Sequence, residues 1–322
     1  MMKNETVYLF PGQGSQYRGM ALDFLDASDA VRKLFDTTSA ILEKDMRAVL
    51  RDSDEETLKR TDVSQPAVTL ANLAAAAYLA EQGWRAKACA GFSLGEYAAL
   101  VCAGVISMED CFRLVKARGL LMQKSADRLR ETAKEDPLAA PGMAAVVGLA
   151  PAEVESLIAQ WREAGLEGLY AANINSPRQV AISGTADALI EAEKRFKEAG
   201  AKRVLRLQVA GPFHSPLIAD AAEAFRPVLE AVNFANPAIP LYSNVTGKQV
   251  FSGEEAKKLA LLQITSPVRW VDEETAIAAA GFSACLEVGP GKVLQGLWRD
   301  AGSEIPCFLA GTVENIEKIG AS

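Results

Sequence analysis

The sequence predicts an α/β fold in which a smaller unit is inserted into one large domain. Short apolar runs of strand length alternate with longer stretches of helical periodicity along the 322 residues, which is typical of α/β proteins. Near the middle, a charged segment ending in Pro141-Gly142 has no apolar period, and we interpret it as a connection between domains. The expected boundaries are 1–140 with 211–322 for the large domain and 141–210 for the small one.

The first part of the large domain contains two expected strands. Residues 7–10 form an apolar run that ends at a Pro-Gly turn, and residues 86–91 form a second strand of small residues. Helices are expected over the alanine-rich residues 66–82, over 96–102 and over 108–130.

The small unit alternates strands and helices in the order βαββαβ, which is the order of a ferredoxin-like unit. Pro151 opens its first helix, a position that proline favours, and Gly200 ends its second. Residues 175–178 are expected to form a turn. The strands are expected over 143–149, 169–174, 179–183 and 202–209, and the helices over 151–164 and 186–199.

After the small unit, the sequence again predicts both helices and strands of the large domain, so the small unit interrupts that domain. Helices are expected near 216–231, 254–263 and 292–299, and strands near 239–243 and 284–288.

Composition excludes several classes of protein. A formal net charge of −7 argues against a nucleic-acid partner, which would favour a basic excess. The chain has five cysteines, an odd number, and no Cys-x-x-Cys motif, so neither a disulfide framework nor a zinc ribbon is indicated. The longest near-apolar segment, 67–80, is too short for a membrane span, and we expect a cytoplasmic protein.

The first candidate for chemistry is Ser93, which lies in a Gly-x-Ser-x-Gly pattern between an expected strand and an expected helix. This context is typical of the nucleophile elbow of α/β hydrolases, where glycines permit a strained turn and close backbone packing. It predicts an α/β-hydrolase-like large domain. The alternative is that the serine is an ordinary helix cap.

A serine nucleophile needs a base, and His214 is the single histidine of the chain. The count excludes any site that needs two imidazoles, including histidine-rich zinc sites. His214 lies in a proline-bounded loop, Gly211 to Pro216. A lone histidine is more often structural than catalytic, but the elbow elsewhere in the chain favours the catalytic role.

Arg118 is the third candidate. It follows Leu114 by four residues and Val115 by three, so it lies on the apolar stripe of its helix. A charge that faces a core is costly unless it is paired, and a guanidinium suits a carboxylate. Arg118 therefore either forms an internal ion pair, reaches solvent at the rim, or binds a substrate that carries a carboxylate.

The glycine-rich turn at 11–16 fails both phosphate-binding patterns. Tyr17 stands where a dinucleotide fold needs its third glycine, and Met20 stands where a P-loop needs lysine. What remains is a tight turn whose backbone N–H groups could stabilise an oxyanion.

Taken together, these segments resemble the malonyl-CoA:acyl-carrier-protein transacylase family of fatty-acid synthesis. The resemblance spans about residues 6–312, and its motifs occur in family order: Phe10 to Gln16, Gln65-Pro66-Ala67, Gly91 to Glu96, Arg118-Gly119, Ala172 to Pro177, Phe213-His214-Ser215, Pro267 to Trp270 and Glu287 to Gly291. The segment at 124–142 is longer than is usual for the family.

The resemblance implies a role for each matched residue. Ser93 would accept the acyl group, His214 would be its base, and the backbone carbonyl of Gln263 would hold the histidine in place of an aspartate. Arg118 would bind the malonyl carboxylate. The backbone N–H groups of Gln13 and Leu94 would form the oxyanion hole. Asn173 and Asn175 would line the cleft between the two domains. Phe213 precedes the histidine, and a phenylalanine at this place in related polyketide enzymes goes with a preference for malonyl.

The resemblance implies a ping-pong transfer of malonyl from malonyl-CoA to acyl carrier protein by a monomer that needs no metal or cofactor. The alternatives are a polyketide-type acyltransferase, a serine thioesterase or esterase, and a non-catalytic carrier-binding module. An acidic carrier would need a local basic patch. The candidates are Arg195, Lys197, Lys202, Arg203, Arg206, Lys257 and Lys258, most of which we expect to form ordinary solvated faces.

Overall fold

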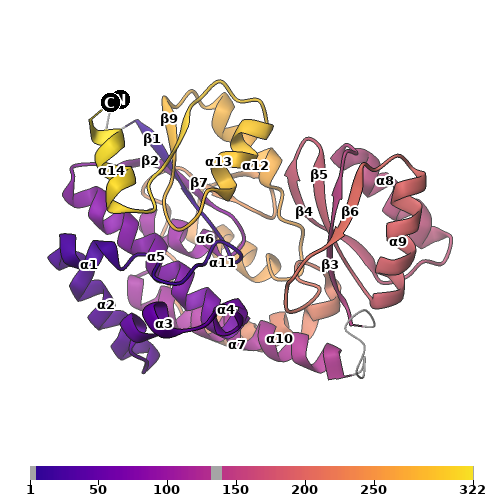
Figure 1. The fold of residues 1–322 in the computed structure, drawn as a ribbon, viewed down its shortest axis with the longest axis horizontal. Coiled ribbons are helices and arrows are strands. Elements are labelled where there is room, and N and C mark those ends of the chain that lie inside the picture. Colours follow the sequence, from indigo (N-terminus) through magenta and orange to yellow (C-terminus); the bar gives the residue numbers. More distant parts are fainter. Residues whose placement is uncertain (1–4, 132–139, 322) are drawn as a thin grey trace.

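The computed structural model describes residues 5–131 and 140–321 and confirms a mixed α/β fold. It contains one six-stranded and one four-stranded sheet. Figure 1 shows the six-stranded sheet and its helices on one side of the molecule and the four-stranded sheet on the other. The expected connection at 131–142 falls largely outside the described residues.

The six-stranded sheet has the order β10-β9-β1-β2-β7-β8 and is parallel except for the edge strand β8. β1 is buried along its whole length, which explains its unbroken apolar run. The strands are β1 (Thr6–Phe10), β2 (Ala86–Gly91), β7 (Leu241–Ser243), β8 (Lys248–Val250), β9 (Ala284–Glu287) and β10 (Cys307–Leu309).

Helices cover both faces of this sheet, and alternate residues of β1 contribute to the two cores. Tyr8 and Phe10 belong to the larger core, whereas Val7 and Leu9 pack into a second core formed with α12 and α13. The helices are α1 (Asp23–Ala27), α2 (Asp29–Leu42), α3 (Met46–Asp52), α4 (Glu55–Lys59), α5 (Thr61–Glu81), α6 (Gly95–Cys102), α7 (Met108–Glu131), η2 (Pro216–Ile218), α10 (Ala219–Glu230), α11 (Gly253–Leu262), α12 (Trp270–Ala279), α13 (Val293–Asp300) and α14 (Val313–Gly320).

The four-stranded sheet is antiparallel, has the order β4-β5-β3-β6, and packs against α8 and α9 around a separate core. Its chain order, βαββαβ, is the expected one. The elements are β3 (Gly142–Val147), α8 (Pro151–Glu163), β4 (Leu169–Ser176), β5 (Gln179–Gly184), α9 (Ala186–Glu198) and β6 (Arg203–Arg206).

Two expectations for this sheet are wrong in their bounds. The last strand is expected to reach Val209, but β6 ends at Arg206, and only one further backbone hydrogen bond, from the Leu207 N–H to the Met143 oxygen at 2.9 Å, extends its pairing with β3. The turn expected at 175–178 is shorter, because Ser176 still pairs with Gln179 across the hairpin.

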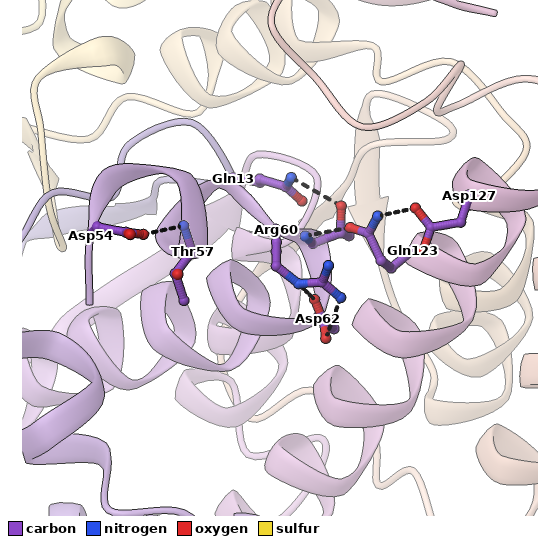
Figure 2. Close-up of polar contacts among 8 residues, drawn as sticks. Gln13, Asp54, Thr57, Arg60, Asp62, Gln123 and Asp127 are labelled. Atoms are coloured by element: carbon purple, nitrogen blue, oxygen red, sulfur yellow. Dashed lines mark hydrogen bonds and ion pairs between the residues drawn. The ribbon is translucent and has the colours of Figure 1, made fainter. Parts of the chain in front are cut away.

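The alanine-rich helix α5 begins at Thr61, five residues before the expected start at Pro66. Its first residues lack a local side-chain cap, and the N–H of Thr61 instead donates to Oε1 of Gln123, on α7, at 2.8 Å (Figure 2). The expected single helix over 216–231 is divided into η2 and α10, with Pro216 in the first turn of η2.

The parallel strands bring several loops to one edge of the sheet. Because neighbouring parallel strands point the same way, the residues that follow their carboxyl ends lie side by side. Gln13 follows β1, Ser93 follows β2, Asn244 follows β7 and Gly289 follows β9. Within the described residues, no helix is long and apolar enough to cross a membrane.

Candidate active site

Ser93 occupies a sharp turn between β2 and α6. Its φ of 50° lies in the left-handed region, which is strained for a residue with a side chain. The flanking glycines permit the turn, since a Cβ on Gly91 would lie 2.0 Å from the carbonyl carbon of Gly95, and a Cβ on Gly95 would lie 1.9 Å from the Phe10 oxygen. The geometry matches the nucleophile elbow that the Gly-x-Ser-x-Gly pattern predicts.

The structure brings Ser93 and His214 together although 121 positions separate them. Ser93 Oγ lies 2.7 Å from His214 Nε2, and His214 Nδ1 lies 2.9 Å from the backbone oxygen of Gln263. A carbonyl oxygen only accepts, so Nδ1 carries the proton and donates it to Gln263. Nε2 is therefore the acceptor that faces the serine hydroxyl.

His214 is buried and its φ of 55° is also left-handed. Desolvation by burial, together with the positive charge of Arg118, lowers the pKa of His214 to about 4. The imidazole is therefore neutral near pH 7, as a base that accepts the Ser93 proton must be.

Arg118 lies beside the serine and is 1% exposed. Its Nη2 donates to Oε1 of Gln263 at 3.1 Å and lies 3.5 Å from Ser93 Oγ, and its guanidinium stacks over the Tyr97 ring at 5.5 Å. Among the described residues, no carboxylate lies within 4.0 Å of it, and its buried Nε has no hydrogen-bond partner. Arg118 therefore neither forms an internal ion pair nor reaches solvent at the rim. Burial lowers the pKa of its guanidinium.

Gln13 and Leu94 flank the serine on the chain segments that follow β1 and β2. Within residues 5–131 and 140–321, the backbone N–H groups of both residues have no hydrogen-bond acceptor. The Gln13 side chain approaches Thr61 Oγ1 at 3.4 Å. The Thr61 N–H in turn donates to Gln123, and Nε2 of Gln123 donates to Asp127 at 2.8 Å (Figure 2).

The other expected site residues lie on neighbouring elements. Phe213 is buried, and its carbonyl accepts a hydrogen bond from Ser183 Oγ. Asn173 and Asn175 are buried in β4. The backbone of Asn173 pairs with that of Val268, which belongs to the core beside the six-stranded sheet. Neither asparagine forms a hydrogen bond with Ser93, His214 or Arg118 among the described residues, and Oδ1 of Asn175 has no partner.

Asn244 is a site residue that the sequence reasoning missed. Its Oδ1 accepts the N–H of Ser93 at 2.7 Å, and its Nδ2 donates to the Gly91 oxygen and to Oε1 of Glu273, each at 2.7 Å. Its own N–H donates to Oε2 of Glu96 at 2.9 Å. The available signal was its place directly after an expected strand.

A groove with a volume of about 530 Å³ lies beside Gln123 and the first residues of the small sheet. It contains four basic side chains against two acidic ones: Lys59, Arg60, Arg130 and Arg206, with Glu56 and Asp127. Of the expected carrier-docking residues, only Arg206 lines it. Arg195 and Lys197 form ion pairs with Glu191 and Glu193 on α9.

Comparisons with known proteins agree on one family. Residues 7–319 match the model of the acyl transferase domain. The chain is 39% identical over 293 residues to the malonyl CoA-acyl carrier protein transacylase of Escherichia coli strain K12, covering 90% of both chains. It is 34% identical over 314 residues to the enzyme of the same name from Bacillus subtilis strain 168, covering 98% of this chain and 96% of that one.

The fold is also similar to solved structures. One is a malonyl-transacylase in complex with a type II polyketide-synthase acyl-carrier protein, with a TM-score of 0.88, 35% identity and 98% of both chains covered. Another is the transacylase from Streptococcus pneumoniae, with a TM-score of 0.90, 32% identity, and 98% of this chain and 99% of that one covered.

Proposed function

The chain belongs to the acyl transferase domain family, and from that premise we propose that it transfers a malonyl group from malonyl-CoA to the phosphopantetheine thiol of acyl carrier protein. The observation that carries the choice of malonyl is Arg118. It is a buried cation 3.5 Å from Ser93 Oγ, with no carboxylate within 4.0 Å among the described residues and an unpartnered Nε. A substrate carboxylate would supply the missing anion.

In the first half-reaction, Ser93 Oγ attacks the thioester carbonyl carbon while Nε2 of His214 takes the hydroxyl proton. The tetrahedral intermediate collapses, the carbon–sulfur bond breaks, and coenzyme A leaves as the thiol with the proton from His214. Malonyl-Ser93 remains. The carbonyl of Gln263 stabilises the imidazolium through Nδ1.

In the second half-reaction, the carrier's thiol attacks malonyl-Ser93 and passes its proton to His214. The carbon–oxygen bond of the ester breaks, and the proton returns to Ser93 Oγ. The same base therefore serves both halves of a ping-pong cycle.

The oxyanion of both tetrahedral intermediates would be held by the backbone N–H groups of Gln13 and Leu94. Two observations support this assignment: both groups lack an acceptor among the described residues, and both lie at the edge of the sheet where Ser93 lies. The N–H of Ser93 is already bound to Asn244. Losing one such donor costs about 3 kcal/mol of transition-state stabilisation.

We also propose that residues 1–140 with 211–322 form an α/β-hydrolase-like catalytic domain and that residues 141–210 form a ferredoxin-like subdomain. The two sheets and their separate cores support this division. Asn173 and Asn175 would line the cleft between the two, and Phe213 would limit the acyl group beside His214.

A monomer suffices for this chemistry, which requires no cofactor, because acid–base and nucleophilic groups all come from this chain. The proposal covers a carrier of either fatty-acid or polyketide synthesis, because one of the similar solved structures is a malonyl-transacylase bound to a type II polyketide-synthase carrier. A thioesterase with the same elbow would have no use for Arg118.

The deciding experiment is intact-mass measurement after mixing the protein with equal concentrations of malonyl-CoA and acetyl-CoA. We expect a stable malonyl adduct on Ser93, none on Ser93→Ala, and transfer of the adduct when holo-carrier is added. Hydrolysis without an adduct would support the thioesterase, and no reaction would support the carrier-binding module.

A further inference from the structure

The nucleophile elbow is held from below by a set of buried polar side chains that no step of the proposed chemistry uses. Asn244, Glu96 and Glu273 are each at most 4% exposed and come from three separate elements: the segment after β7, the first turn of α6, and α12. Buried polar groups of this kind are costly unless they are fully paired, so their hydrogen bonds indicate what they do.

The four contacts of the Asn244 amide fix its orientation. Two groups on one side, the N–H of Ser93 and Nε2 of Gln263, can only donate, and both point to Oδ1 at 2.7 and 3.1 Å. Two groups on the other side, the Gly91 oxygen and Oε1 of Glu273, accept from Nδ2. A flipped amide would oppose like groups at the contacts with Ser93, Gln263 and Gly91.

Asn244 thereby bridges the end of β2 and the turn that carries Ser93. It binds the oxygen of Gly91 before the turn and the N–H of Ser93 within it, so its amide spans the strained residue. Gln263 reinforces the arrangement, since its Nε2 also donates to the Ser93 oxygen at 3.0 Å. The φ of 50° at Ser93 persists only where surrounding contacts impose it.

From these contacts we infer that Asn244, oriented by Glu273, is a positioning residue that aims Ser93 at His214 and keeps the Ser93 N–H out of the oxyanion hole. The inference rests on the proposed role of Ser93 as the nucleophile. Glu273 touches no reacting atom and acts through Asn244. Burial beside Glu96 raises the pKa of Glu273, which favours its neutral form.

The neighbouring glutamate provides a matched control. Glu274 follows Glu273 on α12 and is equally buried, but its Oε1 accepts from Nε1 of Trp270 at 2.7 Å instead of from Asn244. Replacing either residue by methionine removes one buried acceptor. Only the change at Glu273 frees the Asn244 amide.

The test compares Glu273→Met, Glu273→Gln and Glu274→Met with the unmodified chain. Single-turnover malonyl-CoA acylation gives the saturating rate and the half-saturating concentration, and an alkyl fluorophosphonate probe gives the labelling rate of Ser93. We expect Glu273→Met to lower both rates at least tenfold and to change the half-saturating concentration less than twofold, because Arg118 is untouched. Glu273→Gln keeps an acceptor oxygen and should stay within threefold, as should Glu274→Met.

Unchanged rates in Glu273→Met, or an equal loss in Glu274→Met, would overturn the inference. If Glu273→Met does not fold, Asn244→Asp serves instead, because it keeps the acceptor for Ser93 but loses both N–H donors. An unchanged labelling rate of Ser93 in Asn244→Asp would then overturn the inference. The fluorophosphonate needs the nucleophile but no malonyl group. Labelling without malonylation in the unmodified protein would therefore refute the proposed function and leave this inference testable.

Discussion

Ser93 and His214 lie 2.7 Å apart through Oγ and Nε2, and both have a left-handed backbone, with φ of 50° and 55°. Such conformations cost of order 1–3 kcal/mol each in a residue with a side chain. Their coincidence at the two ends of one hydrogen bond indicates that the fold maintains this strain in order to align nucleophile and base.

The pH dependence of acylation should report the environment of His214. The base must be neutral, and burial with the Arg118 charge lowers its pKa from 6.5 to about 4. We expect kcat/KM for malonyl-CoA to stay level from pH 8 down to about 5.5 and to fall with a midpoint near 4. A midpoint near 6.5 would show that the imidazole is more hydrated than the structure indicates.

Arg118 should control the choice of acyl group. Removing the side chain in Arg118→Ala should lower kcat/KM for malonyl-CoA by about 10²–10³-fold, since a buried charge-assisted contact is worth about 3–4 kcal/mol. Acetyl-CoA has no carboxylate, so its kcat/KM should change less than about threefold. Parallel steady-state assays with the two thioesters give both values.

An equal loss for both thioesters would mean that Arg118 is structural. Arg118 also contacts Gln263 and Tyr97, so a structural role would disturb the site for both thioesters alike. Arg118→Lys is the informative companion: it keeps the charge but loses the planar fork, and should recover only part of the malonyl preference.

Parts of this site were accessible from the sequence because their signals are local. The glycines around Ser93 and the apolar stripe that carries Arg118 depend on residues within one or two turns. The histidine count left His214 as the only imidazole. The distance between Ser93 and His214, by contrast, depends on where a loop after the small sheet returns to the large one.

Other parts could not be predicted because the local pattern is misleading. Glu273 lies in the first turn of α12 and Glu274 directly follows it, near the helix end where acidic residues ordinarily complement the helix dipole at the surface. Here tertiary packing buries both. The start of α5 is equally non-local, because the residue that binds the Thr61 N–H is Gln123, 62 positions away.

The elbow glycines should be intolerant of a single methyl group. In Gly95→Ala the new Cβ would lie 1.9 Å from the backbone oxygen of Phe10, which cannot yield without moving β1. We expect a loss of about 3 kcal/mol in the free energy of unfolding, measured by urea denaturation.

Gly296 provides the control for this effect. It lies within α13, and nothing lies within 4 Å of the Cβ that alanine would add. Gly296→Ala should raise the free energy of unfolding by up to about 1 kcal/mol, because alanine has the higher helix propensity. Equal destabilisation at both positions would contradict the packing argument.

The last prediction concerns the acyl carrier. Carrier proteins are acidic and this chain is acidic overall, so docking needs a local cationic surface. The groove that contains Arg206 and Arg130 has an excess of basic side chains and is the surface that we test. Arg206→Glu should slow malonyl transfer to the carrier at least tenfold and leave acylation of Ser93 within threefold. Lys257→Glu is the matched reversal away from the groove, where Lys257 donates to the Glu230 oxygen and stacks on Phe234. Measuring the two half-reactions separately, by intact mass and by malonyl-carrier formation, distinguishes docking from chemistry. A similar loss in both half-reactions, or in both variants, would exclude this groove as the docking surface.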